Sequence, residues 1–92
     1  MIYEWDAEKA RANWRKHSVS FDEATTVFED TLGRIVSDPR HSIEEDRCVL
    51  LGLSRRNRLL AVMFTEQGKA VRIISARRAM RQERRDYEEK AP

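Results

Sequence analysis

The sequence predicts a single α+β domain in which a small antiparallel β-sheet follows two short helices and precedes a third. A chain of 92 residues can bury one thin hydrophobic core, which suits one domain spanning residues 1–92. Apolar residues recur at helical spacing before residue 30 and after residue 75. Between them, residues 47–76 hold β-prone runs separated by turn residues, which is typical of a meander of antiparallel strands.

The first predicted elements are a strand and a helix. Met1 to Trp5 is aromatic and apolar enough for a strand, and Asp6 offers a side-chain oxygen that can cap the next helix. In that helix Ala10, Trp14 and His17 share one stripe. We therefore assign both tryptophan rings to the core.

A second short helix is predicted after Ser20, which stands three residues before Glu23, the spacing of a capping box. The apolar residues that follow have helical spacing: Phe21, Ala24, Val27 and Phe28. Gly33 ends this helix, Arg34 to Ser37 is β-prone, and Asp38-Pro39 marks a turn.

Three further strands complete the predicted meander: Cys48 to Leu53, Leu59 to Thr65 and Val71 to Ala76. The turns between them hold Asn57 and Gly68, two residue types that tolerate positive φ.

A final helix is predicted from about Ala76 to Glu89, with Tyr87 as its core anchor. Ser75 would cap it, so Arg77 and Arg78 would lie in its first turn, where the helix dipole and free N–H groups disfavour positive side chains. An anion bound there would satisfy the N–H groups and both guanidinium groups. The apolar stripe of this helix is narrow, so the helix buries little area.

Charge divides the chain into two unlike halves. Residues 1–46 carry 6 basic and 11 acidic side chains, a net charge of −5, whereas residues 47–92 carry 12 and 5, a net charge of +7. This asymmetry predicts a basic face, which favours a polyanion or an acidic partner. A solvated surface of mixed charge is the alternative.

Composition also excludes several classes of site. Cys48 is the single cysteine, so we predict a reducing, cytoplasmic setting and a core position for its thiol. The longest apolar run, Leu59 to Phe64, is too short to cross a bilayer, and the first residues lack the pattern of a signal peptide. The sequence has no zinc-ligand spacing and no glycine-rich phosphate loop, so no metal and no cofactor is predicted.

The arginines that remain suit RNA. Alternation places Arg72 on the face of Ile74 and Ala76, where its charge needs either a phosphate or a carboxylate such as that of Glu66 or Glu45. Arginine planes hold phosphates and stack on bases, and a neighbouring turn extends the basic surface with Arg55, Arg56 and Arg58.

RNA cleavage would require few protein groups, because RNA supplies its own nucleophile, the 2′-hydroxyl. The protein need only position the phosphate, neutralise its charge and move protons. Candidates for proton transfer are His17, His41 and Glu45, with Lys16 as a charge stabiliser or as a base. The simpler alternatives are a hydrogen-bonded core or C-cap position for His17 and an exposed loop position for His41.

A series of six short motifs covers nearly the whole chain. They are EWD-x-EKA-x-x-N from Glu4, KH-x-VSF from Lys16, DPRHS from Asp38, RLL-x-V from Arg58, RIISAR-x-A from Arg72 and E-x-x-x-YEE from Glu83. In this order and at these intervals they resemble the BrnT family of bacterial toxins. The resemblance implies a RelE-like fold and a ribonuclease activity that stops translation. It also implies a ribbon-helix-helix antitoxin of the BrnA type, a heterotetramer with two copies of each protein, and operator DNA bound through the antitoxin.

The same resemblance implies a set of site residues: Lys16, Glu45, Arg47, Arg58, Arg72 and Arg77. Arg72 and Arg77 would contact the reacting phosphate, Lys16 would stabilise charge, and Glu45 would act as the general base. Arg47 and Arg58 would bind flanking phosphates. Apart from the resemblance, we expect Arg78 to bind RNA as well. Ser18 and Asn57 depart from the family by replacing glycines, and asparagine adopts positive φ more readily than serine.

Two other classes of function stay open. One is a non-catalytic module, such as a degenerate toxin, that binds RNA or an acidic partner through the arginine face. The other is a subunit that folds only in a complex, which would fit the narrow stripe of the last helix.

Overall fold

The computed structural model describes residues 1–36 and 47–90 of the chain. The elements follow the order β1 (Ile2–Glu4), α1 (Ala7–His17), α2 (Phe21–Thr26), the 3₁₀ turn η1 (Val27–Glu29), β2 (Arg34–Val36), β3 (Arg47–Leu53), β4 (Leu59–Gln67), β5 (Ala70–Arg78) and α3 (Arg81–Lys90). The predicted α+β class, with two helices before the main sheet and one after it, is confirmed.

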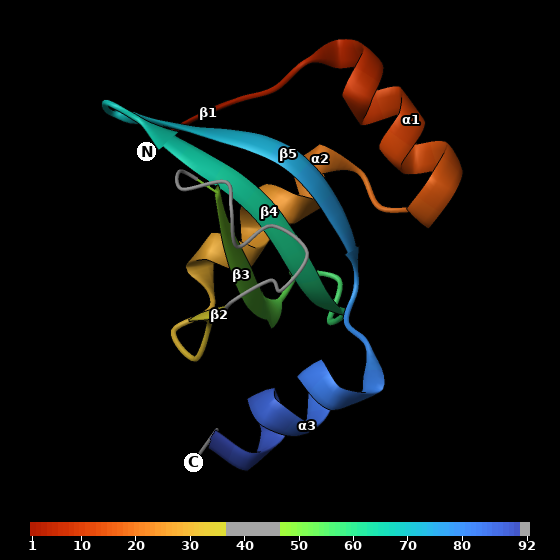
Figure 1. The fold of residues 1–92 in the computed structure, drawn as a ribbon, viewed down its shortest axis with the longest axis vertical. Coiled ribbons are helices and arrows are strands. Elements are labelled where there is room, and N and C mark those ends of the chain that lie inside the picture. The colour runs from red at the N-terminus through yellow and green to blue at the C-terminus, as the bar shows by residue number, and fades with distance from the viewer. Residues whose placement is uncertain (37–46, 91–92) are drawn as a thin grey trace.

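The described strands form one five-stranded sheet in the order β1-β5-β4-β3-β2 (Figure 1). Strands β2 to β5 make the predicted antiparallel meander. Strand β1 instead pairs in parallel with β5, with Ile2 opposite Ala70 and Glu4 opposite Arg72. Strand β1 and the first residues of β5 therefore lie side by side although they are far apart in sequence.

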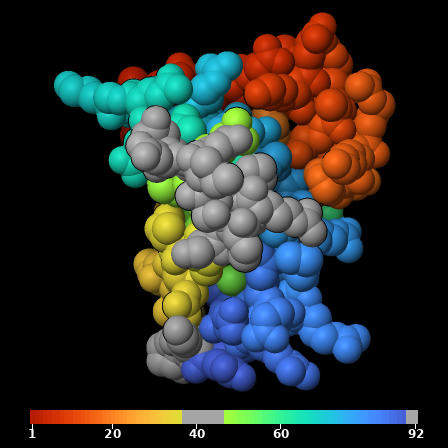
Figure 2. All heavy atoms as spheres, viewed as in Figure 1, coloured from red at the N-terminus to blue at the C-terminus, as the bar shows by residue number. Residues whose placement is uncertain are grey.

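Each face of the sheet has its own core. On one face α2 and the inner side of α1 pack against a cluster that includes Phe21, Leu60 and Ile73, each at most 2% exposed. On the other face α3 packs through Tyr87 on Val49, Leu51, Leu59, Ala61 and Met63. Burying a large apolar side chain contributes about 2 kcal/mol. Helices α1 and α3 lie at opposite ends of the molecule, α1 in red to orange and α3 in blue (Figures 1 and 2).

Local hydrogen bonds explain where the first helices begin and end. The Lys9 N–H donates to the Asp6 carboxylate at 2.9 Å, and the Glu23 N–H donates to the Ser20 hydroxyl at 3.0 Å, so both predicted caps are confirmed. Ser18 ends α1 with φ of 56°. It therefore adopts the left-handed conformation of the glycine it replaces.

The predicted start of the last helix is wrong. Strand β5 continues to Arg78 and α3 spans Arg81–Lys90, so Ser75 and Arg77 lie in the strand and not at a helix start. Pairing with β4 decides the difference, because Arg77 lies opposite Ala61 in the antiparallel ladder. The ladder gives these backbone N–H groups hydrogen-bond partners, which they would lack in the first turn of a helix. No anion at a helix terminus is needed to explain these arginines.

A β-bulge determines which residues of β5 share a face. The pairing with β4 shifts register between Met63 and Phe64, which leaves Ile74 of β5 without an opposite residue. Alternation is reset beyond such an extra residue. The prediction that Arg72 and Ala76 share a face is therefore wrong, because Ala76 is buried in the core under α1 and α2.

Trp14 was expected in the core, and that prediction is also wrong. The residue is 52% exposed, because α1 approaches β5 through Ala10 and the buried Asn13, with Trp14 at the margin of that stripe. Trp5 does pack against the core, with its ring 5.8 Å from that of Phe21.

Tyr87 is the predicted core anchor of α3, and this is confirmed by its 7% exposure. Its hydroxyl donates to the Asp30 carboxylate at 2.7 Å. Burial and the Asp30 charge raise the pKa of Tyr87 to about 12. Cys48 is half-buried against the core, as expected for a structural thiol. Within residues 1–36 and 47–90, no helix is long and apolar enough to cross a membrane.

Candidate functional site

A groove of about 220 Å³ lies between α1 and β5. Its lining comes from one side of α1 and the middle of β5: Lys9, Ala12, Asn13, Lys16, His17, Ile74 and Ser75. Two predicted site residues, Lys16 and His17, therefore stand side by side in the last turn of α1. Arg77 follows two residues after Ser75 and is near enough to His17 for its charge to act on the imidazole. We call this the α1–β5 groove.

Asn13 fixes α1 against β5 beneath the groove. Its side-chain nitrogen donates to the carbonyl oxygens of Val19 and Ala76 at 2.9 and 2.8 Å. Its side-chain oxygen accepts from the Ala76 N–H at 3.1 Å. Asn13 is 6% exposed, so the orientation of α1 depends on bonds shielded from water. Sequence reasoning missed this residue, although a polar side chain on the inner stripe of the helix was a usable signal.

The electrostatics of the groove favour a neutral imidazole. Burial, the Lys16 ammonium and the Arg77 guanidinium all act to hold the pKa of His17 below its usual value of 6.5. At neutral pH the imidazole is therefore uncharged and can accept a proton. The cations that depress its pKa also make the groove attractive to a phosphate.

Arg77 is oriented by the first turn of α3. Its guanidinium makes a bidentate pair with Glu83, with N···O distances of 2.7 and 3.1 Å. Glu83 also caps α3 by accepting from the Met80 N–H at 2.8 Å. Because the Arg77 side chain is only 30% exposed, its geometry is set by the fold.

Three predicted arginines lie on the same face of the sheet. Arg47 and Arg72 both lie opposite Thr65, and Arg77 lies opposite Ala61, four residues earlier on β4. Residues that differ by an even number on one strand share a face, so all three arginines face away from α2. Without the bulge, Arg72 and Arg77 would face opposite sides of the sheet.

The contacts of Arg72 and Arg47 differ in kind. Arg72 forms an ion pair of 3.8 Å with Glu4 on β1, whereas one predicted alternative was a pair with Glu66. The side chains of Arg72 and Glu4 are both about 40% exposed. Such a pair contributes about 0–1 kcal/mol, so a phosphate can replace the carboxylate at low cost. Arg47 contacts the sulfur of Met63 at 3.7 Å.

Arg58 is held inside the fold. Its Nε donates to Glu23 Oε2 at 2.9 Å, and its Nη2 donates to Glu23 Oε1 and, at 3.1 Å, to the carbonyl of Ser18. Ser54 donates to the same carboxylate at 2.7 Å. The hydrogen bond from Arg58 is the main cause of the lowered pKa of Glu23, which burial opposes. This network joins the end of α1 to α2 and to the turn before β4.

The other predicted residues lie elsewhere. Arg78 is exposed and lies opposite Leu60, so it faces the side of the sheet that α1 and α2 cover. Arg55 pairs with Glu29 of η1 at 2.9 Å. His41 and Glu45 lie outside the described residues. Among the residues that the structure describes, no cluster of His, Cys, Asp and Glu could hold a metal ion.

Comparison with known proteins identifies the family of the chain. The sequence model described as "Ribonuclease toxin, BrnT, of type II toxin-antitoxin system" matches residues 5–83. The crystal structure of the Brucella abortus ribonuclease toxin BrnT is similar, with a TM-score of 0.68 and 22% identity over 88% of this chain and 100% of that chain. At that identity the likeness shows a common fold. None of the curated proteins compared with the chain matches it. The family match covers most of the chain, and the chain therefore belongs to the BrnT family of ribonuclease toxins of type II toxin–antitoxin systems.

Proposed function

We propose that this chain cleaves RNA without a metal ion, that the cleavage inhibits translation, and that the α1–β5 groove is the active site. The observation that carries the proposal is that Lys16 and a neutral His17 line one groove, with Arg77 near enough for its charge to act on the imidazole, in a chain of a ribonuclease toxin family. The groups that transphosphorylation requires are a base and positive charge at the phosphate.

In the proposed reaction the RNA 2′-hydroxyl gives its proton to the imidazole of His17 and its oxygen attacks the adjacent phosphorus. The bond from phosphorus to the 5′-oxygen breaks and that oxygen takes a proton from solvent water, to which the His17 imidazolium returns its own proton. The products are a 2′,3′-cyclic phosphate and a 5′-hydroxyl end. Lys16 and Arg77 stabilise the negative charge that develops on the phosphoryl oxygens. Glu45, the general base that the resemblance implies, stays a prediction, as does a part for His41.

Flanking phosphates are assigned to the same face of the sheet. Arg72 and Arg47 lie there beyond Arg77 along β5 and β3, and the exposed pair of Arg72 with Glu4 can open toward a phosphate. Arg58 is assigned to the fold, because its guanidinium is bound by Glu23 and Ser18 and its side chain is 19% exposed, against 30% for that of Arg77. Arg78 is at most a peripheral contact, since it faces the other side of the sheet.

The family also implies an antitoxin partner. We propose a ribbon-helix-helix antitoxin of the BrnA type, two copies of which join two toxins and carry the complex to operator DNA. The mass of the purified complex tests the stoichiometry directly. A 1:1 complex would contradict it.

Exchange of two exposed lysines tests the location of the active site. Lys16→Gln removes a charge from the groove, and Lys69→Gln removes the same charge from the β4–β5 turn. We expect purified Lys16→Gln to cleave RNA about 10-fold to 100-fold more slowly in EDTA, with the Lys69→Gln rate unchanged. Equal rates for the two variants would place the reaction elsewhere, and no cleavage by any of the three proteins would favour a binding module.

A further inference from the structure

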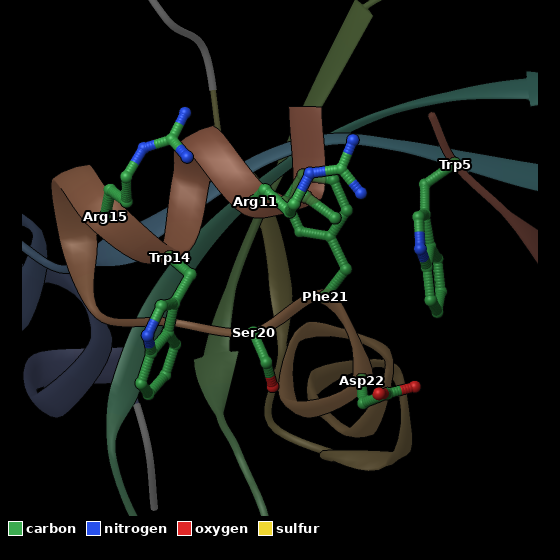
Figure 3. A pocket seen from close by; sticks show the side chains of 8 residues that line it. Trp5, Arg11, Trp14, Arg15, Ser20, Phe21 and Asp22 are labelled. Carbon is green, nitrogen blue, oxygen red and sulfur yellow. The ribbon is translucent and has the colours of Figure 1, made fainter. Parts of the chain in front are cut away.

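A second groove, of about 410 Å³, lies on the side of α1 opposite the α1–β5 groove. Figure 3 shows the indole rings of Trp5 and Trp14 on its two sides, with the ring of Phe21 between them. Arg11 and Arg15 extend from α1 along one edge, and Asp22 of α2 lies on another. We call it the tryptophan groove; it takes no part in the reaction proposed above.

The fold does not account for the position of Trp14. Helix α1 is already attached to β5 by Asn13, and it is capped at both ends. Trp14 is nevertheless 52% exposed, one of the large apolar side chains that the described surface presents to water. A tryptophan at the edge of an apolar hollow, with arginines beside it, is the composition that dominates binding at protein–protein interfaces.

The charges at the edge favour a protein over RNA. Arg11 and Arg15 lie one helical turn apart, and the 3.8 Å pair of Arg11 with Glu8 is exposed on both sides and therefore weak. Asp22 and the acidic first turn of α2 stand opposite, within a half of the chain that carries a net charge of −5. A continuous phosphate backbone would meet these carboxylates, whereas a peptide can place its own charges to suit both edges.

We propose that the tryptophan groove is a docking site for an amphipathic helix of the antitoxin. One bulky apolar side chain of that helix lies between Trp5 and Trp14. Two carboxylates of that helix, four residues apart, face Arg11 and Arg15, because residues at this spacing lie on one face of a helix, as Arg11 and Arg15 do on α1. The proposal relies on the proposed function only for the identity of the partner. Docking here places the antitoxin beside the α1–β5 groove without occupying Lys16 or His17.

The test measures binding of the purified antitoxin, produced from the gene beside that of the toxin, to variants of the full toxin chain. Trp14→Ala is compared with Leu32→Ala, another exposed apolar residue, and Arg15→Glu with Arg84→Glu on α3. We expect Trp14→Ala to weaken binding about 30-fold and Arg15→Glu about 10-fold. The matched controls should stay within about twofold of wild type. Trp14→Phe keeps a ring and should restore most of the affinity.

The outcomes separate this proposal from the proposed function. Weakened antitoxin binding by Trp14→Ala, with RNA cleavage at the wild-type rate, supports docking at the tryptophan groove. If the wild type binds the antitoxin through Trp14 but cleaves no RNA, the docking site stands and the catalytic proposal fails. Docking is overturned if the wild type does not bind the antitoxin, or if Trp14→Ala binds as tightly as Leu32→Ala. Loss of RNA binding in place of antitoxin binding would assign the groove to RNA and overturn it as well.

Discussion

Replacement of Asn13 by alanine is expected to loosen α1 from β5 without removing a group assigned to the reaction. The side chain makes three hydrogen bonds of 2.8 to 3.1 Å to backbone groups of Val19 and Ala76, in a position that is 6% exposed. A buried hydrogen bond contributes about 1 kcal/mol net, so the loss should be about 3 kcal/mol in the free energy of unfolding. The backbone groups left without partners act to increase this loss, and water entering from the α1–β5 groove acts to reduce it.

Urea unfolding of the purified variant measures this loss. Arg15→Ala is a suitable control, because it changes an exposed residue of the same helix and should alter stability by no more than about 0.5 kcal/mol. Under conditions where Asn13→Ala is folded, we also expect slower RNA cleavage, since Lys16 and His17 lose their fixed distance from Arg77. If Asn13→Ala is as stable as the control, the three hydrogen bonds do not hold α1 in place.

Other predictions follow from single contacts. The cleavage rate should rise with pH through the pKa of His17, which lies below 6.5, and level off above it, because only the neutral imidazole accepts a proton. Glu23→Gln should cost about 3 kcal/mol at neutral pH, since it leaves Arg58 without its carboxylate. The pKa of Glu23 is lowered in the folded state, so its ionised carboxylate contributes stability above pH 4.5, the usual pKa. This stability is lost as the pH falls through the pKa of the folded state, and Glu23→Gln should not show that loss. Arg72→Ala should abolish growth inhibition with the melting temperature little changed. Tyr87→Phe should cost about 1 kcal/mol through loss of the hydrogen bond to Asp30.

Each of these has a clear contrary result. A pH profile whose midpoint lies above 6.5 would argue against His17 as the base. A Glu23→Gln variant with wild-type stability would show that the network with Arg58 is dispensable. Continued growth inhibition by Arg72→Ala would remove that residue from the site, with Arg55→Ala as the matched exposed control. An unchanged urea midpoint for Tyr87→Phe would mean that the hydrogen bond to Asp30 does not help to hold α3.

Local signals in the sequence predicted most of the elements. Asp6 and Ser20 cap their helices as expected, and Asn57 takes φ of 61° in its turn. The errors came from long-range pairing: β4 extends β5 to Arg78 where helical spacing predicted a helix, and the bulge at Ile74 resets the faces. Neither pairing partner nor register is encoded in the residues of one strand.

The site was predicted in part for the same reason. The motifs identified Lys16, Arg72 and Arg77. The structure adds that the bulge in β5 puts Arg72 and Arg77 on one face of the sheet, and that Asn13 holds α1, with Lys16, against β5. Arg58 lies in a cluster of arginines typical of a phosphate-binding surface. Its partner Glu23 lies 35 residues earlier, so their ion pair could not be predicted from the local sequence. Charge alone does not tell an internal ion pair from a ligand site.

The rate of RNA cleavage by purified His17→Gln beside wild type, both in EDTA, tests the central claim most directly. We expect wild type to cleave RNA to a 2′,3′-cyclic phosphate, and the variant to be folded but slower by about 100-fold or more. Cleavage by the variant at the wild-type rate, or loss of wild-type cleavage in EDTA, would contradict a metal-independent reaction at the α1–β5 groove.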